Sequence, residues 1–319
     1  MEKDLGRLYY LANFKSYFRN KRYHFVVYGL PAIASALGSI TTAEIKIVEG
    51  KGWTVNDQRP ATPGYKKKKY DEAMQSVRNV INHLNINTDN QKLEITFAGD
   101  LIAASGVGAS AAQCTSLARA LNNTFNLGLD DEKVNEAAYE GEKAYHGTPS
   151  GIDNTASTYG GLIWFVKNLK GGKNTMDLLQ SPKKMPLVIA NSGLTASTAE
   201  VVADVSRLKE KHPNKFKNIF NEYEKLANDA RKALLKGDII NVGDLMNQNH
   251  KLLQEITVSG EINDILAELA LKYGALGAKM TGTGRGGLVI ALVENEKIQE
   301  KIALSFEKAG YDAWKTMIG

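Results

Sequence analysis

The sequence lacks several features that would assign it to a protein class at once. Cys114 is the only cysteine among 319 residues, which excludes an internal disulfide and a cysteine-based zinc cluster and favours a small core residue over a reactive thiol. No apolar run approaches the ~20 residues of a membrane span, so we expect no membrane partner. The net charge is only +5, and no interleaving of basic and aromatic residues indicates nucleic acid. We therefore expect a cytoplasmic, globular protein.

The chain also lacks the G-x-x-x-x-G-K-[ST] loop of many ATPases, but it has a different glycine-rich turn, SGVGAS, at 105–110. This turn joins the alternating segment 93–99, a strand pattern, to a helical pattern at 111–125. Glycines let a backbone approach a ligand, and the free N–H groups of a helix start favour phosphate. The motif is equally compatible with a phosphate cradle, where Ser110 reaches a bound Mg²⁺, and with an ordinary turn capped by Ser110.

A second glycine-rich turn, GTGRGG, occupies 282–287 and formally matches G-x-G-x-x-G. The apolar segment LVIALV that follows predicts a strand rather than a helix, so a dinucleotide-binding βαβ unit is excluded. The alternative is a hairpin that presses against a substrate or a nucleotide. Arg285 at its tip either meets an anion or is solvated.

The stretch GTPSGIDNTAS at 147–157 lies between a predicted helix at 131–146, with Asp130 as its N-cap, and a predicted strand at 161–166. Its Gly, Pro, Ser, Asp and Asn residues are typical of turns, so we expect a polar loop here. Asp153 is then either an ordinary loop residue or a catalytic base fixed at a rigid turn.

Strands followed by packed helices occur twice along the chain, which favours an α+β fold with two domains, 1–170 and 171–319. In the second half we expect helices at about 196–211, 215–236, 239–257, 260–273 and 295–309, and strands at 187–191, 288–293 and 311–317.

Read in order, these segments resemble the GHMP kinases. SGVGAS matches the second motif of that family and KMTGTGRGG the third, while GEKAYHGTPSGIDNTASTYGG at 141–161 is similar to mevalonate kinases, most closely the short protozoan type. The resemblance covers residue 24 to the C-terminus. It implies the two-domain GHMP kinase fold, with a ribosomal protein S5 domain 2-like N-terminal domain and a ferredoxin-like α+β C-terminal domain.

The resemblance also implies an activity: transfer of the γ-phosphoryl group of ATP to the C5 hydroxyl of mevalonate, in isoprenoid precursor synthesis. Asp153 would be the catalytic base, and Ser110 and Glu142 would hold Mg²⁺. The residues implied to bind the ATP phosphates are Ser105, Gly106, Gly108, Ala109 and Ser110. Those implied on the substrate side are His24, Thr198, Gly282 and Gly284. Members of the family are often dimers, so a homodimer is expected.

The first motif departs from the family pattern. His24 matches its histidine, but Tyr23 replaces a glutamate and Tyr17 stands where a lysine is expected. A two-residue insertion would give the lysine's role to Lys15, whose charge would favour the ionised base. Three explanations stay open: residues 1–22 are not native, the enzyme uses Lys15, or the chain binds nucleotide without turnover. Another GHMP kinase, acting on phosphomevalonate or homoserine, is the alternative function.

Overall fold

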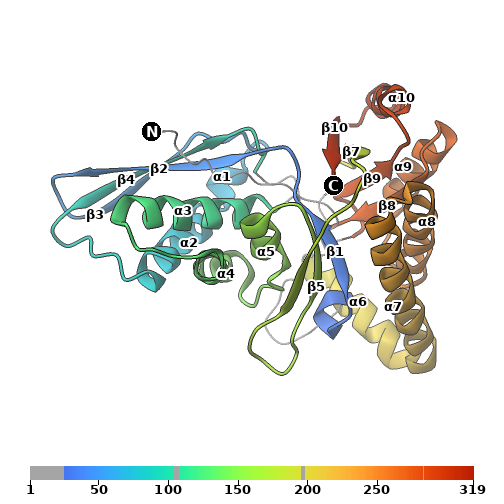
Figure 1. Ribbon diagram of the computed structural model, residues 1–319, viewed down its shortest axis with the longest axis horizontal. Helices are drawn as coiled ribbons and strands as arrows, with labels where there is room; N and C mark the ends of the chain where they lie inside the picture. Colours follow the sequence, from blue (N-terminus) through green and yellow to red (C-terminus); the bar gives the residue numbers. More distant parts are fainter. Residues whose placement is uncertain (1–24, 104–107, 195–197, 283) are drawn as a thin grey trace. The chain divides into compact units, whose positions relative to one another are not determined.

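The computed structural model describes residues 25–103, 108–194, 198–282 and 284–319. These residues form two compact units (Figure 1). Unit 1 consists of Gly38–Gly160, and unit 2 of residues 25–37 together with Gly161–Gly319. The chain therefore changes unit after Gly160, whereas a domain boundary at residue 170 stays a prediction from sequence.

Unit 1 is a three-stranded sheet covered by helices. Its strands are β2 (Thr41–Val48), β3 (Gly52–Asp57) and β4 (Lys92–Gly99), in the order β2-β4-β3, with β2 antiparallel and β3 parallel to β4. Its helices are α1 (Tyr65–Lys68), α2 (Tyr70–His83), α3 (Ala109–Phe125), α4 (Asp131–His146) and α5 (Ile152–Tyr159). Figure 1 shows α2, α3 and α4 on one side of the sheet.

The core of unit 1 follows from the alternation in β4. Leu93, Ile95 and Phe97 are fully buried against the helices, while the residues between them are more exposed. The strand predicted at 93–99 is confirmed. Asp130 caps α4 as predicted, because its side chain accepts a hydrogen bond from the Lys133 backbone N–H.

Gly141 lets α4 lie unusually close to its neighbours. A Cβ at this position would lie 2.6 Å from the Cys114 Sγ of α3 and 2.8 Å from a methyl group of Val80 in α2. No side chain fits there, so the glycine brings Glu142, the next residue, close to α3. Cys114 is buried, as predicted, and burial together with the charge of Glu142 raises the pKa of its thiol well above the usual range.

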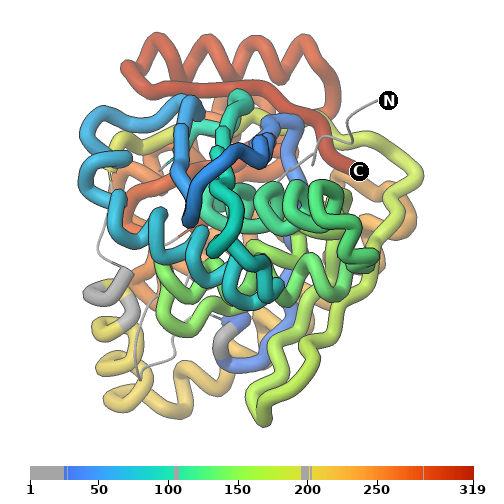
Figure 2. The backbone as a smooth tube through the Cα atoms, turned by 90° about the vertical axis from the view of Figure 1, so that its left-hand side faces the viewer, coloured from blue at the N-terminus to red at the C-terminus, as the bar shows by residue number. Residues whose placement is uncertain are grey.

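Unit 2 contains a four-stranded antiparallel sheet. Its elements in chain order are β7 (Met185–Asn191), α6 (Thr198–Lys211), α7 (Pro213–Lys236), α8 (Ile239–Glu255), α9 (Glu261–Lys272), β8 (Gly277–Thr281), β9 (Leu288–Leu292), α10 (Glu296–Lys308) and β10 (Ala313–Ile318). The strand order is β10-β7-β9-β8, which is 4-1-3-2 in chain order and ferredoxin-like, as predicted. Figure 2 shows α10 lying along β10.

A second sheet of unit 2 contains β1 (Ala32–Ser35), β5 (Leu162–Val166) and β6 (Thr175–Leu179), in the antiparallel order β1-β5-β6. The short 3₁₀ helix Phe25–Tyr28 precedes it. Phe25 stacks on Tyr223 of α7 with 3.6 Å between ring centroids, and the Tyr223 hydroxyl donates to the Pro31 carbonyl at 3.0 Å. These contacts attach the start of the described chain to α7.

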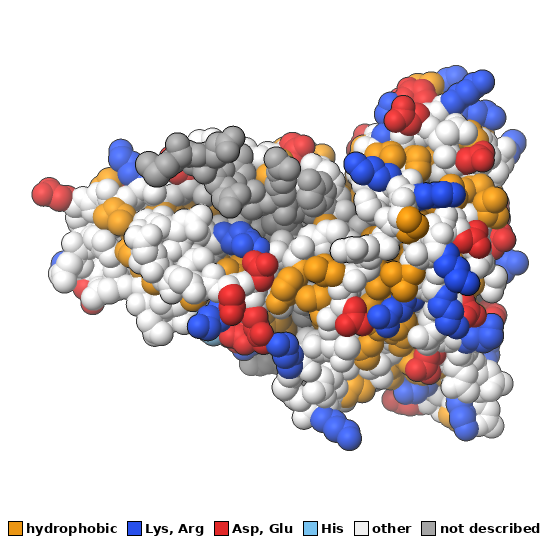
Figure 3. Space-filling model, viewed as in Figure 1, with side chains coloured by type: hydrophobic (Ala, Val, Ile, Leu, Met, Phe, Trp, Pro, Cys, Tyr) orange, Lys and Arg blue, Asp and Glu red, His pale blue; other side chains and the backbone are white. Residues whose placement is uncertain are grey.

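The surface carries charges of both signs. On the face that Figure 3 shows, Lys and Arg side chains alternate with Asp and Glu rather than forming a patch of one sign. Within the described ranges, no helix has the length and apolar character required to cross a bilayer.

Candidate active site

Three side chains of unit 1 meet at the start of α3. Ser110 lies in the first turn of this helix, and Glu142 and His146 lie one turn apart on α4. The His146 Nε2 is 3.4 Å from the Ser110 Oγ and 3.4 Å from the Glu142 Oε2. The structure therefore brings together the two predicted Mg²⁺ ligands and adds His146 to them.

The chemistry of this group suits a hard cation. Glu142 is 1% exposed, and a buried carboxylate is costly unless it is paired or hydrogen-bonded. Carboxylate and hydroxyl oxygens are the donors that Mg²⁺ prefers, and Mg²⁺ usually keeps several waters or phosphate oxygens. Among the described residues, no three His, Cys, Asp or Glu side chains form a metal cage. The donor set thus fits an ion shared with a substrate phosphate.

The start of α3 has the geometry of an anion site. Gly108 adopts a left-handed conformation with φ 73°, and the 17-residue helix begins directly after it at Ala109. The first N–H groups of a helix have no partner inside it and carry its positive dipole end. Gly108, Ala109 and Ser110 lie at this helix start, and their role in binding phosphate stays a prediction; the predicted residues Ser105 and Gly106 lie outside the described residues.

Arg59 holds the beginning of α3 in place through hydrogen bonds, and the sequence alone did not predict this role. It is 4% exposed and donates to the Ala109 carbonyl at 3.1 Å and to the Gln113 Oε1 at 2.6 Å. Two further hydrogen bonds, of 2.9 and 2.8 Å, join its guanidinium to the two carboxylate oxygens of Asp57. Tyr145 of α4 also donates to the Gln113 Oε1, at 3.1 Å. This network connects β3, α3 and α4 beneath the cradle.

The Asp57–Arg59 pair is an ion pair with a clear electrostatic effect. Burial alone would raise the pKa of Asp57, but the hydrogen bonds and charge of Arg59 outweigh it and hold the pKa below its usual value. The sequence did contain a signal for this pair. Asp57 ends a strand and Arg59 follows two positions later, where side chains of an extended chain point to the same side.

Asp153 lies on a helix, so the expectation of a polar loop through 157 is wrong. Helix α5 starts at Ile152, directly after Gly151, which has φ 90° and serves as its N-cap. Asp153 is 4% exposed in the first turn, where the dipole stabilises a carboxylate, and α5 contacts both α3 and α4. The predicted base is thus held by a packed helix rather than by a turn, and its catalytic role stays a prediction.

The second glycine-rich turn of the sequence joins β8 to β9 in unit 2. Gly282 and Gly284 have φ 97° and 90°, which residues with side chains rarely adopt. A Cβ on Gly284 would lie 2.4 Å from the Val258 carbonyl. Asn263, which is fully buried, accepts from the Gly286 N–H at 2.8 Å and donates to the Gly286 carbonyl at 3.0 Å. Gly284 and Gly286 of this turn are thus held in place by Val258 and Asn263.

Arg285 is not simply solvated. Its guanidinium donates to the Thr257 carbonyl at 3.0 Å and forms an ion pair with Asp204 of α6. The expectation that this residue is solvated is therefore wrong, and a contact with a ligand anion stays a prediction. Thr198 is the first residue of α6, and Lys15 and His24 lie outside the described residues.

Comparison with known proteins assigns the family. The profile of the GHMP kinases N terminal domain matches residues 73–161, and that of the GHMP kinases C terminal matches 230–312. The chain belongs to the GHMP kinase family. The prediction of this family and of its two-domain α+β fold is confirmed.

The individual relatives include several mevalonate kinases. The mevalonate kinase of Thermococcus sibiricus is 30% identical over 306 residues, which cover 90% of this chain and 89% of the relative. The crystal structure of L. major mevalonate kinase in complex with R-mevalonate has a TM-score of 0.89 and 37% identity, and covers 99% of this chain and 96% of that one. The Streptococcus pneumoniae phosphomevalonate kinase (TM-score 0.72, covering 97% and 100%) is only 13% identical and shares the fold alone.

Proposed function

We propose that this chain is a kinase that transfers the γ-phosphoryl group of ATP to the C5 hydroxyl of mevalonate. One observation carries the proposal: Ser110, Glu142 and His146 meet at the start of α3, and helix α5, whose first turn contains Asp153, packs against the same pair of helices. The similarity to the L. major enzyme, whose structure contains R-mevalonate, supports this choice of acceptor.

Phosphoryl transfer requires mainly that the two substrates are positioned and that the charge of the transferred phosphoryl group is stabilised. The N–H groups at the start of α3 would bind the ATP phosphates, and the Arg59 network would keep this turn in place. Ser110 and Glu142 would hold Mg²⁺, which neutralises phosphate charge when it is bound. His146 lies between these two side chains and would orient them.

Asp153 would act on the acceptor. Its carboxylate would take the proton of the C5 hydroxyl as the hydroxyl oxygen bonds to the γ-phosphorus and the bond to ADP breaks. Its position in a packed helical turn limits the freedom of the base, which favours proton transfer at a fixed point. Lys15, His24, Thr198, Gly282 and Gly284 would complete the substrate side, with Lys15 supplying the cation that the first motif otherwise lacks.

The test is ADP release by the purified full chain with MgATP and mevalonate, beside Asp153→Asn and the control Asp89→Ala, which changes an exposed aspartate. We expect turnover in the parent and the control, and a loss of at least about 100-fold in kcat for Asp153→Asn. Phosphomevalonate and homoserine serve as alternative acceptors. Turnover of one of these with none of mevalonate would replace the proposed substrate, and ATP binding without any turnover would replace the proposed activity.

The metal ligands have a separate test. Glu142→Gln removes the charge but keeps the shape, so we expect the Mg²⁺ concentration for half-maximal activity to rise about tenfold or more. Equal Mg²⁺ dependence in parent and variant would exclude Glu142 as a ligand. A homodimer and a cytoplasmic location are also proposed from the family, and light scattering on the purified chain tests the first.

A further inference from the structure

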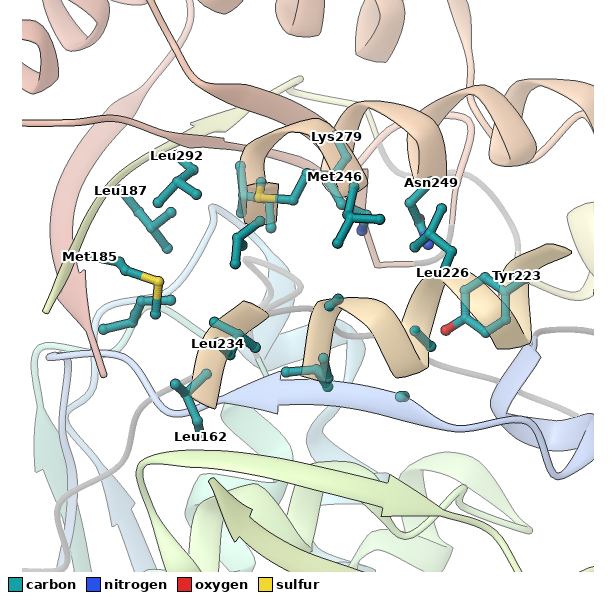
Figure 4. Close-up of a pocket in the computed structure, with 18 residues that line it drawn as sticks. Leu162, Met185, Leu187, Tyr223, Leu226, Leu234, Met246, Asn249, Lys279 and Leu292 are labelled. Atoms are coloured by element: carbon teal, nitrogen blue, oxygen red, sulfur yellow. The ribbon is translucent and has the colours of Figure 1, made fainter. Parts of the chain in front are cut away.

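The glycine-rich turn between β8 and β9 contacts α6, the helix that begins at Thr198. Both strands of this hairpin are buried along their whole length. Lys279 of β8 and Met246 of α8 line the same apolar cavity, and β8 packs against α8 (Figure 4). The turn therefore starts from a packed hairpin and can serve as a fixed point for a neighbouring element.

Arg285 forms the link from this turn to α6. Its guanidinium forms an ion pair with the Asp204 carboxylate, and the two side chains are 34% and 29% exposed. The same guanidinium donates to the Thr257 carbonyl at 3.0 Å and to the Thr257 hydroxyl at 3.2 Å. The Arg285 backbone N–H donates to the Val258 carbonyl at 2.8 Å. The arginine thus joins the turn, the end of α8 and α6.

This ion pair differs from an ordinary surface pair in how far its arginine is ordered. A surface pair contributes little when two long side chains must be ordered to form it. Thr257 already orders the guanidinium, so less conformational freedom is lost when Arg285 pairs with Asp204. Arg285 also has a left-handed backbone conformation, with φ 49°. A residue with a side chain persists in this conformation where surrounding contacts compensate for the strain.

The same turn also holds the chain that leads to α6. The Gly287 N–H donates to the Leu194 carbonyl at 2.9 Å, and the Ser192 N–H donates to the Gly287 carbonyl at 2.9 Å. A Cβ on Gly286 would lie 2.6 Å from the Leu194 carbonyl oxygen, so a side chain would prevent this approach. The start of α6 therefore lies between two points that the turn fixes, Leu194 before it in the chain and Asp204 after it.

We propose that Arg285 is a positioning residue for the acceptor: through Asp204 it fixes α6 and with it the position of Thr198 in the chain. The inference rests on the proposed function, because that proposal places Thr198 on the substrate side. Arg285 acts through α6 and not by contact with the substrate. Its loss therefore raises KM for mevalonate, whereas a mere loss of folded protein lowers kcat and leaves KM unchanged.

The test is steady-state kinetics of the purified full chain, with mevalonate and MgATP varied in turn. Arg285→Met removes the donors and keeps the length of the side chain. We expect KM for mevalonate to rise about three- to fivefold, the effect of one partly exposed ion pair, and KM for ATP to stay unchanged. Asp204→Ala breaks the same pair from the other side and should give the same rise. The double variant should be no worse than either single variant, because both remove one interaction.

Arg207→Met is the matched control. Arg207 also pairs with Asp204, but it lies on α6 itself and is 75% exposed, so its loss does not detach α6 from the turn. We expect both KM values of this variant to equal those of the parent.

Two results would overturn the proposal while the parent is active. One is an unchanged KM for mevalonate in Arg285→Met. The other is a rise in Arg285→Met with none in Asp204→Ala, which would mean that Arg285 contacts a ligand anion directly. A parent that does not turn over mevalonate is a different result: it would refute the proposed function, and this inference with it.

Discussion

Lys279→Met should stabilise the protein at neutral pH, because the lysine is buried in β8. Burial lowers the pKa of Lys279 from 10.5 to about 7. One pKa unit corresponds to about 1.4 kcal/mol, so at pH 7 the buried lysine costs about 4 kcal/mol relative to the unfolded chain. Methionine has a similar length and no charge. Loss of the hydrogen bond from Lys279 to the Met280 carbonyl costs about 1 kcal/mol, so the free energy of unfolding should rise by about 3 kcal/mol in total.

The pH dependence gives the sharper test. Between pH 7 and 10.5 the unfolded chain binds a proton at Lys279 that the folded chain does not bind, so this residue makes the free energy of unfolding rise with pH. The parent should therefore gain about 1.4 kcal/mol per pH unit relative to Lys279→Met. The two proteins should approach each other in stability as the pH rises toward 10.

Urea unfolding at pH 7.5, 8.5 and 9.5 measures this difference for the two proteins side by side. The nearby His250 on α8 does not interfere in this range, because burial lowers the pKa of its imidazole further below 6.5. A stability difference that does not change with pH would refute the reasoning, since it would mean that Lys279 is protonated in the folded protein at neutral pH.

Three further substitutions test the contacts described above by urea unfolding. Arg59→Met removes the nearer cation from the Asp57 carboxylate, which keeps the Lys66 amine at 3.7 Å, and should cost about 2–3 kcal/mol; Asp57→Leu should restore part of this cost in the double variant, and no recovery would contradict the ion-pair explanation. Gly141→Ala should cost about 1–3 kcal/mol because its methyl group meets a thiol 2.6 Å away, and a neutral effect would mean that α4 moves freely. Asn263→Leu should cost roughly 2–4 kcal/mol, because it leaves the N–H and the carbonyl of Gly286 without their side-chain partner. A stability near that of the parent would mean that water replaces the asparagine side chain.

The long helices and their order were predictable from sequence because their signals are local. The spacing of apolar residues predicted the bounds of α7 and α8 to within two residues at each end. Asp130, as an N-cap residue, predicted the start of α4. Ser110 and Glu142 were placed by the resemblance to a family, and the structure does bring them to either side of one histidine.

The features that were missed depend on distant partners. The polar composition before Asp153 is that of a loop, and α5 forms there because its residues are buried against α3 and α4. Arg59 has its partners Ala109 and Gln113 about fifty positions further along the chain. No local pattern contains such a contact, which is why the support of the α3 start by Arg59 was seen only in the structure.

The pairing of β1 with β5 makes unit 1 an insertion within unit 2. The chain leaves unit 2 after Leu37 and returns at Gly161, and the Ala36 N–H donates to the Gly161 carbonyl at 2.9 Å, so exit and return are adjacent. During synthesis, β1 emerges before all of unit 1 but gains its partner strand only afterwards. A folded unit 1 that already holds its two ends together would lower the entropy cost of closing that long loop. Because Ala36 and Gly161 are hydrogen-bonded neighbours, a connector of a few residues would be long enough to join β1 to β5 in place of unit 1.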